Sequence, residues 1–222
     1  MVPFKDDNTN KNKPFVVYGL IIINVALFFY ELYLGARSSS LFDLFGLIPQ
    51  QLTASFVGGS TTRYIPEVLT LITSQFLHGG IIHIGGNMLL LWIFGNRVEA
   101  SLGHLKFLLF YLICGVLAAL THWVFAINST IPTVGASGAI AGVMGAYIIK
   151  YPRAKIITFP FVTDPIPAVF FLGFWFFYQA FKGVASLGLP DTAGGSAYWA
   201  HAGGFIFGAI LAPMLGLFHE RN

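Results

Sequence analysis

The sequence predicts an all-α fold, a polytopic membrane protein with six transmembrane helices. Hydrophobic residues make up 56% of its 222 residues and charged residues only 9%, whereas a soluble domain carries about 25% charged residues. The charges bound five long neutral blocks, which are residues 14–30, 68–96, 107–149, 165–181 and 192–219. Because about 20 apolar residues cross a bilayer as a helix, four blocks hold one span each and the third, of 43 residues, holds two.

The first span is expected over residues 14–33. Its apolar run exceeds that of a cleaved signal peptide, and no small-x-small cleavage site follows, so it is predicted to stay in the protein. A long first loop, residues 34–76, comes next. Its stretch "LFDLFGLIPQQL" (41–52) is rich enough in Leu and Phe to lie in the membrane interface; the alternative is a flexible connector.

The other five spans follow from the remaining neutral blocks. The turn cluster "INSTIPT" (127–133) divides the 43-residue block in two. The predicted helices are residues 81–100, 106–126, 135–150, 165–185 and 200–217. The chain is thus expected to consist of an N-terminal tail (1–13), one transmembrane domain (14–217) and a short C-terminal tail (218–222).

Six spans place both termini on one side of the membrane, and the basic residues indicate which side. Nine of the twelve Lys and Arg fall on the side of the termini: Lys5, Lys11, Lys13, Arg97, Lys106, Lys150, Arg153, Lys155 and Arg221. Arg37, Arg63 and Lys182 fall opposite. The positive-inside rule makes both termini cytoplasmic, in the cell (inner or plasma) membrane. Topology accounts for the net charge of +3, so no nucleic-acid partner is expected. The single Cys114 rules out an intrachain disulfide. The oligomeric state stays open.

A serine flanked by glycines lies in the fourth predicted helix, in "TVGASGAIAGVMGAY" (133–147). Ser137 belongs to the first turn of that helix, at its non-cytoplasmic end. Small residues at 138, 141, 142 and 145 share its face and allow another helix to approach closely. One interpretation is that the glycines serve packing alone and the serine has no role.

Three more polar side chains are expected at the same depth, which favours a functional site over that interpretation. The second helix opens with "HGGIIHIGGN", so His83 and Asn87 share a face one turn apart. The sixth opens with "WAHAGGFIFG", so His201 lies in its first turn beside a second stripe of small residues, Ala200, Gly204 and Gly208. Two small-residue faces packed together would bring Ser137 and His201 within hydrogen-bonding distance.

These residue types suit acyl transfer. A serine hydroxyl becomes a nucleophile when a neutral histidine takes its proton, which makes Ser137 the nucleophile and His201 the base. The oxyanion would be held by the Ser137 backbone N–H, free in the first turn of its helix, and by the side chains of His83 and Asn87. We assign no carboxylate to these helices, so a Ser–His dyad is expected. No HExxH motif is present, and no metal or cofactor is expected.

The motifs "HGGIIHIGGN", "GASG" and "AHAGGFIFG", in this order on the second, fourth and sixth helices, resemble the rhomboid family of intramembrane serine proteases. The similarity extends through all six spans, and the opening "VPFKDDN" is similar to bacterial members. The resemblance implies a six-transmembrane-helix rhomboid-like bundle with Ser137 as nucleophile, His201 as base, His83 and Asn87 as oxyanion donors, and Gly135 and Gly138 as the motif glycines. Its implied partners are the lipid bilayer and the transmembrane segments of substrate proteins, cleaved near the non-cytoplasmic face. The alternative is a catalytically silent rhomboid-like protein that binds membrane helices.

Two positions depart from the family pattern. Many relatives have Trp-Arg in the first loop two residues after a Glu, whereas here Glu67 precedes Val68, Leu69 and Thr70. Some relatives have an aromatic residue four positions after the nucleophile, stacked on the catalytic histidine; here that position is Ala141. Two further segments each have two interpretations. The aromatic part of the fifth helix (170–181) either borders the route by which a substrate enters, as the resemblance implies, or is a lipid-facing surface. The loop 186–199 is either a cap over the site or a plain connector.

Overall fold

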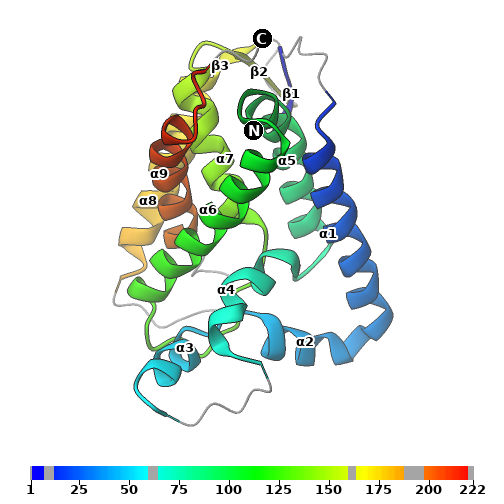
Figure 1. Ribbon diagram of the computed structural model, residues 1–222, viewed down its shortest axis with the longest axis vertical. Helices are drawn as coiled ribbons and strands as arrows, with labels where there is room; N and C mark the ends of the chain where they lie inside the picture. Colours follow the sequence, from blue (N-terminus) through cyan, green and yellow to red (C-terminus); the bar gives the residue numbers. More distant parts are fainter. Residues whose placement is uncertain (1, 8–12, 60–64, 160–163, 188–197, 220–222) are drawn as a thin grey trace.

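The computed structural model describes residues 2–7, 13–59, 65–159, 164–187 and 198–219. Six long helices in these ranges run along the long axis of the molecule (Figure 1). They are α1 (Phe15–Leu34), α5 (Ile81–Leu102), α6 (His104–Phe125), α7 (Ser137–Lys150), α8 (Ala168–Ala185) and α9 (Tyr198–Met214). Each coincides with one of the six predicted spans, so the predicted all-α bundle is confirmed.

The helices differ in how well they suit a membrane by length and hydropathy alone. In the described ranges, three helical stretches are long and apolar enough to cross a membrane: Phe15–Phe45, His104–Phe125 and Ala168–Ala185. α5 meets the same criterion only together with the helical segment Glu67–Phe76, from which it is separated by a bend of 83°, and the number of such stretches is four if this bent pair counts as one. α7 and α9, with 14 and 17 residues, are shorter. The chain is a membrane protein in which lipid need not surround every helix.

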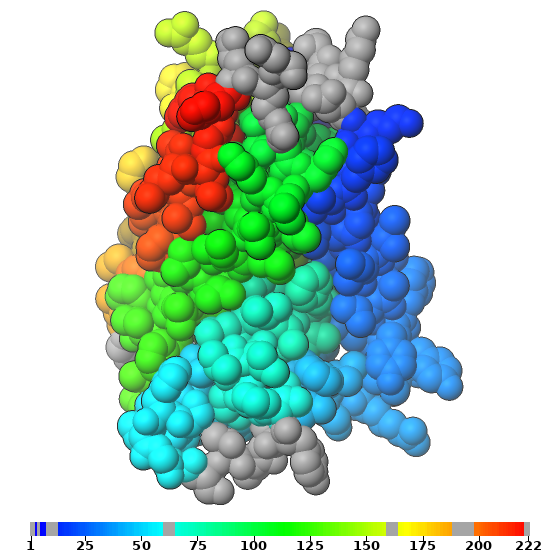
Figure 2. Space-filling view, viewed as in Figure 1, coloured from blue at the N-terminus to red at the C-terminus, as the bar shows by residue number. Residues whose placement is uncertain are grey.

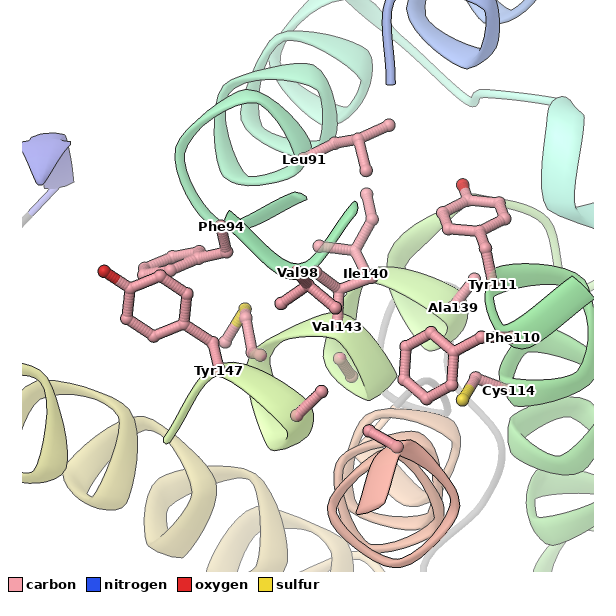
Figure 3. Close-up of a cluster of buried hydrophobic side chains, with 14 of the residues drawn as sticks. Leu91, Phe94, Val98, Phe110, Tyr111, Cys114, Ala139, Ile140, Val143 and Tyr147 are labelled. Carbon is pink, nitrogen blue, oxygen red and sulfur yellow. The ribbon is translucent and has the colours of Figure 1, made fainter. Parts of the chain in front are cut away.

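α7 lies at the centre of the hydrophobic core, which explains how so short a helix is accommodated. All its residues from Gly138 to Tyr147 are buried. Figure 3 shows its side chains between those of α5 and α6. On the face in Figure 2, the green side chains of α6 run between blue α1 and red α9. Neighbouring parts of the chain cover the segment before α7 and provide hydrogen-bond partners for its backbone. Non-helical backbone is therefore tolerated there.

The first loop is largely folded into short helices at the end of the molecule away from the sheet described below (Figure 1). Leu47 forms a two-way backbone pair with Thr133, with N···O distances of 3.0 and 2.7 Å, and Leu52 is fully buried. The described residues of this loop are therefore not a flexible connector. Its elements are η1 (Gly35–Arg37), α2 (Ser38–Phe45), α3 (Pro49–Phe56), η2 (Glu67–Leu69), α4 (Thr70–Thr73) and η3 (Ser74–Phe76).

A small antiparallel sheet, which the sequence analysis did not predict, lies at the opposite end (Figure 1). Its strands are β1 (Val2–Asp6), β2 (Lys155–Phe159) and β3 (Ile166–Pro167), in the order β1-β2-β3. Arg97, near the end of α5, lies 2.9 Å from Asp7 and 3.5 Å from Asp6, and the Tyr147 hydroxyl donates to Asp6 at 2.7 Å. The described part of the N-terminal tail is thus attached to the helical core.

Two buried glutamates connect α1 to neighbouring parts of the chain: Glu99 of α5 contacts its start, and Glu31 near its end contacts the segment before α5. The Glu99 carboxylate accepts hydrogen bonds from the backbone N–H groups of Val16 and Val17, at 2.9 and 2.8 Å. The Glu31 carboxylate accepts one from the backbone N–H of His78, at 3.1 Å. Since the first N–H groups of a helix lack partners within it, Glu99 satisfies two donors that α1 itself cannot.

Candidate active site

The N-terminal halves of α5, α7 and α9 meet the C-terminal half of α8 around a cavity of about 620 Å³. Four of the six predicted site residues, Ser137, His201, His83 and Asn87, line this cavity. The rest of the lining is Gly79, Leu90, Ile131, Pro132, Thr133, Val134, Ile140, Met144, Trp175 and Gln179. None of these side chains carries a carboxylate or a permanent positive charge, so any chemistry here depends on hydroxyl, imidazole, amide and backbone groups.

Ser137 is the first residue of α7, and the preceding Gly135 determines how it is presented. Gly135 has a φ of +127°, which L side chains rarely adopt. Its N–H donates to the Ser74 carbonyl at 2.8 Å. A Cβ at this position would lie only 2.7 Å from His83 Nε2. Glycine is therefore required at 135 both for its backbone conformation and for the close approach of the His83 ring.

Close packing of α7 against α6 and α9 brings Ser137 near His201. A Cβ at Gly138 would lie 2.7 Å from the Ala118 Cβ of α6. On the α9 side, a Cβ at Gly204 would collide with the Gly138 carbonyl oxygen, and one at Gly208 with that of Gly142. The two small-residue stripes thus let α7 and α9 touch backbone to backbone.

This packing leaves Ser137 Oγ and His201 Nε2 2.8 Å apart. That distance is normal for a hydrogen bond, and it is the geometry that a base needs to take a hydroxyl proton. The two residues are 64 positions apart in the chain, so the contact depends entirely on the tertiary fold.

His83 and Asn87 lie on the facing side of the cavity, one turn apart in α5. His83 is half-buried, and its ring meets the ring of His78 edge-on at 5.1 Å between centroids. The Asn87 side chain is buried, and its Nδ2 has no hydrogen-bond partner among the described residues. A buried amide N–H₂ without a partner is unfavourable in a resting protein, so this donor is available to a group that enters the cavity.

Two buried carboxylates of the helical bundle, Glu99 and Glu31, are directed elsewhere. Contrary to the expectation that the helices of the site carry no carboxylate, Glu99 belongs to α5; it lies at the opposite end of that helix and contacts the start of α1 and His104. Glu31 contacts the backbone at His78, whose side chain does not line the cavity. Neither acid reaches His201.

The sequence analysis missed the groups that do contact His201 from α8. Gln179 Oε1 lies 3.0 Å from His201 Nδ1, and the Trp175 ring lies 5.8 Å from the imidazole at a tilt of 37°. One sequence signal existed: Gln179 is the single polar amide in the otherwise apolar stretch "FFLGFWFFYQAF". The proposed cap, residues 186–199, falls mostly outside the described residues.

Comparison with known proteins shows the family to which the chain belongs. Residues 66–218 match the family model described as the Rhomboid domain. The chain is 34% identical over 66% of its length to Rhomboid protein 1, mitochondrial, of Saccharomyces cerevisiae, and 32% identical over 92% of its length to Rhomboid protease GluP of Bacillus subtilis. It is also 34% identical over 67% of its length to Presenilin-associated rhomboid-like protein A, mitochondrial, of Danio rerio. These matches span only 42%, 36% and 37% of the respective relatives. The matched region includes Ser137, His201 and their surroundings, and the chain belongs to the rhomboid family.

Proposed function

We propose that this protein is an intramembrane serine endopeptidase that cleaves transmembrane helices of other membrane proteins through a Ser–His dyad. The observation that carries the proposal is the 2.8 Å separation of Ser137 Oγ and His201 Nε2 inside a polar-lined cavity. A catalytically silent relative that binds helices would have no need of this pairing. The name of the Bacillus relative, a rhomboid protease, supports the same activity.

The mechanism follows from the groups that line the cavity. Ser137 Oγ attacks the carbonyl carbon of the scissile peptide as its proton passes to His201 Nε2. The tetrahedral oxyanion is stabilised by the Ser137 N–H at the start of α7, by the Asn87 amide and by His83. His201 then gives its proton to the leaving amine, and an acyl-enzyme forms. Water then attacks the acyl carbon as His201 takes its proton, the bond from that carbon to Ser137 Oγ breaks, His201 returns the proton to Oγ, and the second product leaves as a carboxylic acid.

The position of the cavity suggests where a substrate helix is cut. The cavity lies at the end of α7, α9 and α5 that is distant from the sheet and from most of the basic residues. Of the described Lys and Arg, seven lie at the sheet end and two, Arg37 and Lys182, at the other. We accordingly assign both termini to the cytoplasmic side of a cell membrane. The scissile bond is assigned to the non-cytoplasmic part of the substrate helix. The substrate helix should contain Gly, Pro or polar residues near the scissile bond, because a regular helix shields its carbonyl groups.

Co-expression with a panel of single-span membrane proteins tests this function, with new termini mapped by mass spectrometry. The Ser137→Ala variant is the matched control. We expect new termini in the non-cytoplasmic third of some substrate helices with the wild type and none with the variant. Termini that appear with both proteins, or that map consistently to the cytoplasmic third, would contradict the proposal.

A further inference from the structure

Two side chains of α8 lie against the imidazole of His201, and one of them, Gln179, contacts the ring nitrogen that Ser137 does not. Gln179 and Trp175 are spaced i, i+4 and therefore share one face of α8. Gln179 is buried, with 7% of its surface exposed, and its Oε1 lies 3.0 Å from His201 Nδ1. The Trp175 ring lies against the same imidazole. Both residues line the cavity that contains Ser137.

The chemistry of the amide oxygen determines what this contact does. A carbonyl oxygen can only accept a hydrogen bond, so Nδ1 of His201 must carry its proton when it bonds to Gln179 Oε1. In the neutral imidazole the other nitrogen, Nε2, is then unprotonated and can accept the proton of Ser137 Oγ. The opposite tautomer would present Nε2–H to the serine and could not act as a base.

We propose that Gln179 is a positioning residue that holds His201 in the tautomer and orientation required for proton transfer. Ser137 and His201 alone do not determine that tautomer. The inference rests on the proposed function, in which His201 is the base. Three observations on this chain support it. The described residues that line the cavity include no carboxylate, Ala141 offers only a methyl group at the position from which some relatives stack an aromatic ring, and α8 supplies both a hydrogen-bond acceptor and an aromatic ring.

The same contact stabilises the imidazolium that forms during the reaction. When His201 has taken the serine proton, Nδ1–H remains a donor to the Gln179 oxygen, and a hydrogen bond to a charged group is stronger than one to a neutral group. The Trp175 ring adds an aromatic surface, which favours a neighbouring cation. Loss of Gln179 should thus lower the rate of the chemical step more than it weakens substrate binding.

Steady-state cleavage of one helical substrate, measured across pH in detergent, tests the proposal with two variants of Gln179. Gln179→Leu removes the acceptor at similar size and should lower kcat about 10- to 100-fold at all pH values, with KM little changed. Gln179→Glu keeps an acceptor but adds a negative charge. It should retain most of the kcat plateau, while the acid side of the profile moves to higher pH by about one unit or more, because a carboxylate favours the protonated imidazole.

Asn24→Leu is the matched control, since Asn24 is a buried amide of α1 that bonds only to a backbone carbonyl among the described contacts, that of Leu20. It should keep the wild-type pH profile. Thermal melting of each variant separates loss of fold from loss of rate. If folded Gln179→Leu keeps the wild-type kcat and Gln179→Glu keeps the wild-type pH profile, the positioning role is wrong while the protease function stands. If the wild type itself does not cleave and Ser137 is not reactive, the proposed function fails instead.

Discussion

At the scale of single residues, the proposed site depends on two side chains that can donate hydrogen bonds into the cavity. Asn87 Nδ2 is buried without a partner among the described residues, and His83 Nε2 lies beside Gly135, two residues before the nucleophile. Both side chains line the same cavity as Ser137. Because a donor held in place before the reaction stabilises developing charge without reorganisation, this arrangement favours an oxyanion site.

His83→Ala and Asn87→Ala should each slow cleavage by about 10²- to 10³-fold or less, because one oxyanion donor is removed while the Ser137 N–H remains. Fluorophosphonate labelling of Ser137 should persist in both variants, since Ser137 and His201 are intact. The check is kcat for one substrate together with the extent of labelling. Wild-type kcat in both folded variants would contradict the oxyanion assignment and leave the nucleophile unaffected.

Sequence reasoning located the side chains with a recognisable local pattern and missed those without one. Ser137, His83, Asn87 and His201 each stand beside glycines near the start of a predicted helix, so a common depth followed from helix geometry alone. Gln179 belongs to a different helix, near its C-terminal end. Its contact with His201 depends on how α8 is rotated against α9, and nothing in the local sequence determines that rotation.

At the scale of elements, the pairing of α7 with α9 is what assembles the site. Gly204 and Gly208 approach the carbonyl groups of Gly138 and Gly142 so closely that a methyl group on either would collide with backbone. Backbone cannot move aside as the end of a flexible side chain can, so overpacking is costly here. The hydrogen bond between Ser137 and His201 spans this same interface.

Gly208→Ala should destabilise the protein by about 1–3 kcal/mol and lower cleavage activity, because α9 must shift away from α7. Gly19→Ala is the control: it lies in α1, and a Cβ there would meet nothing within 4 Å. That change should be neutral or stabilise by about 0.5–1 kcal/mol, since alanine favours a helix over glycine. Thermal melting and cleavage rates of both variants should be measured in detergent. Equal effects of Gly208→Ala and Gly19→Ala would contradict this account of the interface.

The elements themselves were predictable to different degrees. Each of the six long helices overlaps a neutral block of the sequence, because the hydropathy of a segment can be read from the segment itself. The sheet was missed because β1 pairs with β2, about 150 positions away along the chain, and such a pairing leaves no local signal. The folded first loop was only partly anticipated, since its order depends on contacts such as that of Leu47 with Thr133.

At the scale of the whole molecule, most of the described basic residues lie at one end, and the proposed orientation depends on that distribution. β1, β2 and the C-terminal ends of α5 and α7 lie at one end of the molecule, whereas α2 and α3 lie at the other (Figure 1). Most of the described basic residues belong to the first of these ends. Cys114 is fully buried in α6, so the chain has a low background for cysteine labelling.

Orientation can thus be measured with single introduced cysteines and a membrane-impermeant maleimide. Val57→Cys, at an exposed position after α3, should react in right-side-out membrane vesicles, whereas Lys13→Cys should react only after permeabilisation. Unaltered protein, with Cys114 alone, is the control and should not react. The reverse pattern for the two variants would contradict cytoplasmic termini and place the cavity on the other side of the membrane.

The central claim is that Ser137 is a nucleophile activated by His201, and the most direct measurement of it is the site of covalent modification by a fluorophosphonate. Folded wild-type protein in detergent should gain one adduct, mapped by mass spectrometry to Ser137. Ser137→Ala and His201→Ala should each lose both the adduct and cleavage, and the double variant should be no worse than either, because the two residues act as a unit. An adduct on another residue, or cleavage at the wild-type rate by folded Ser137→Ala, would contradict the account.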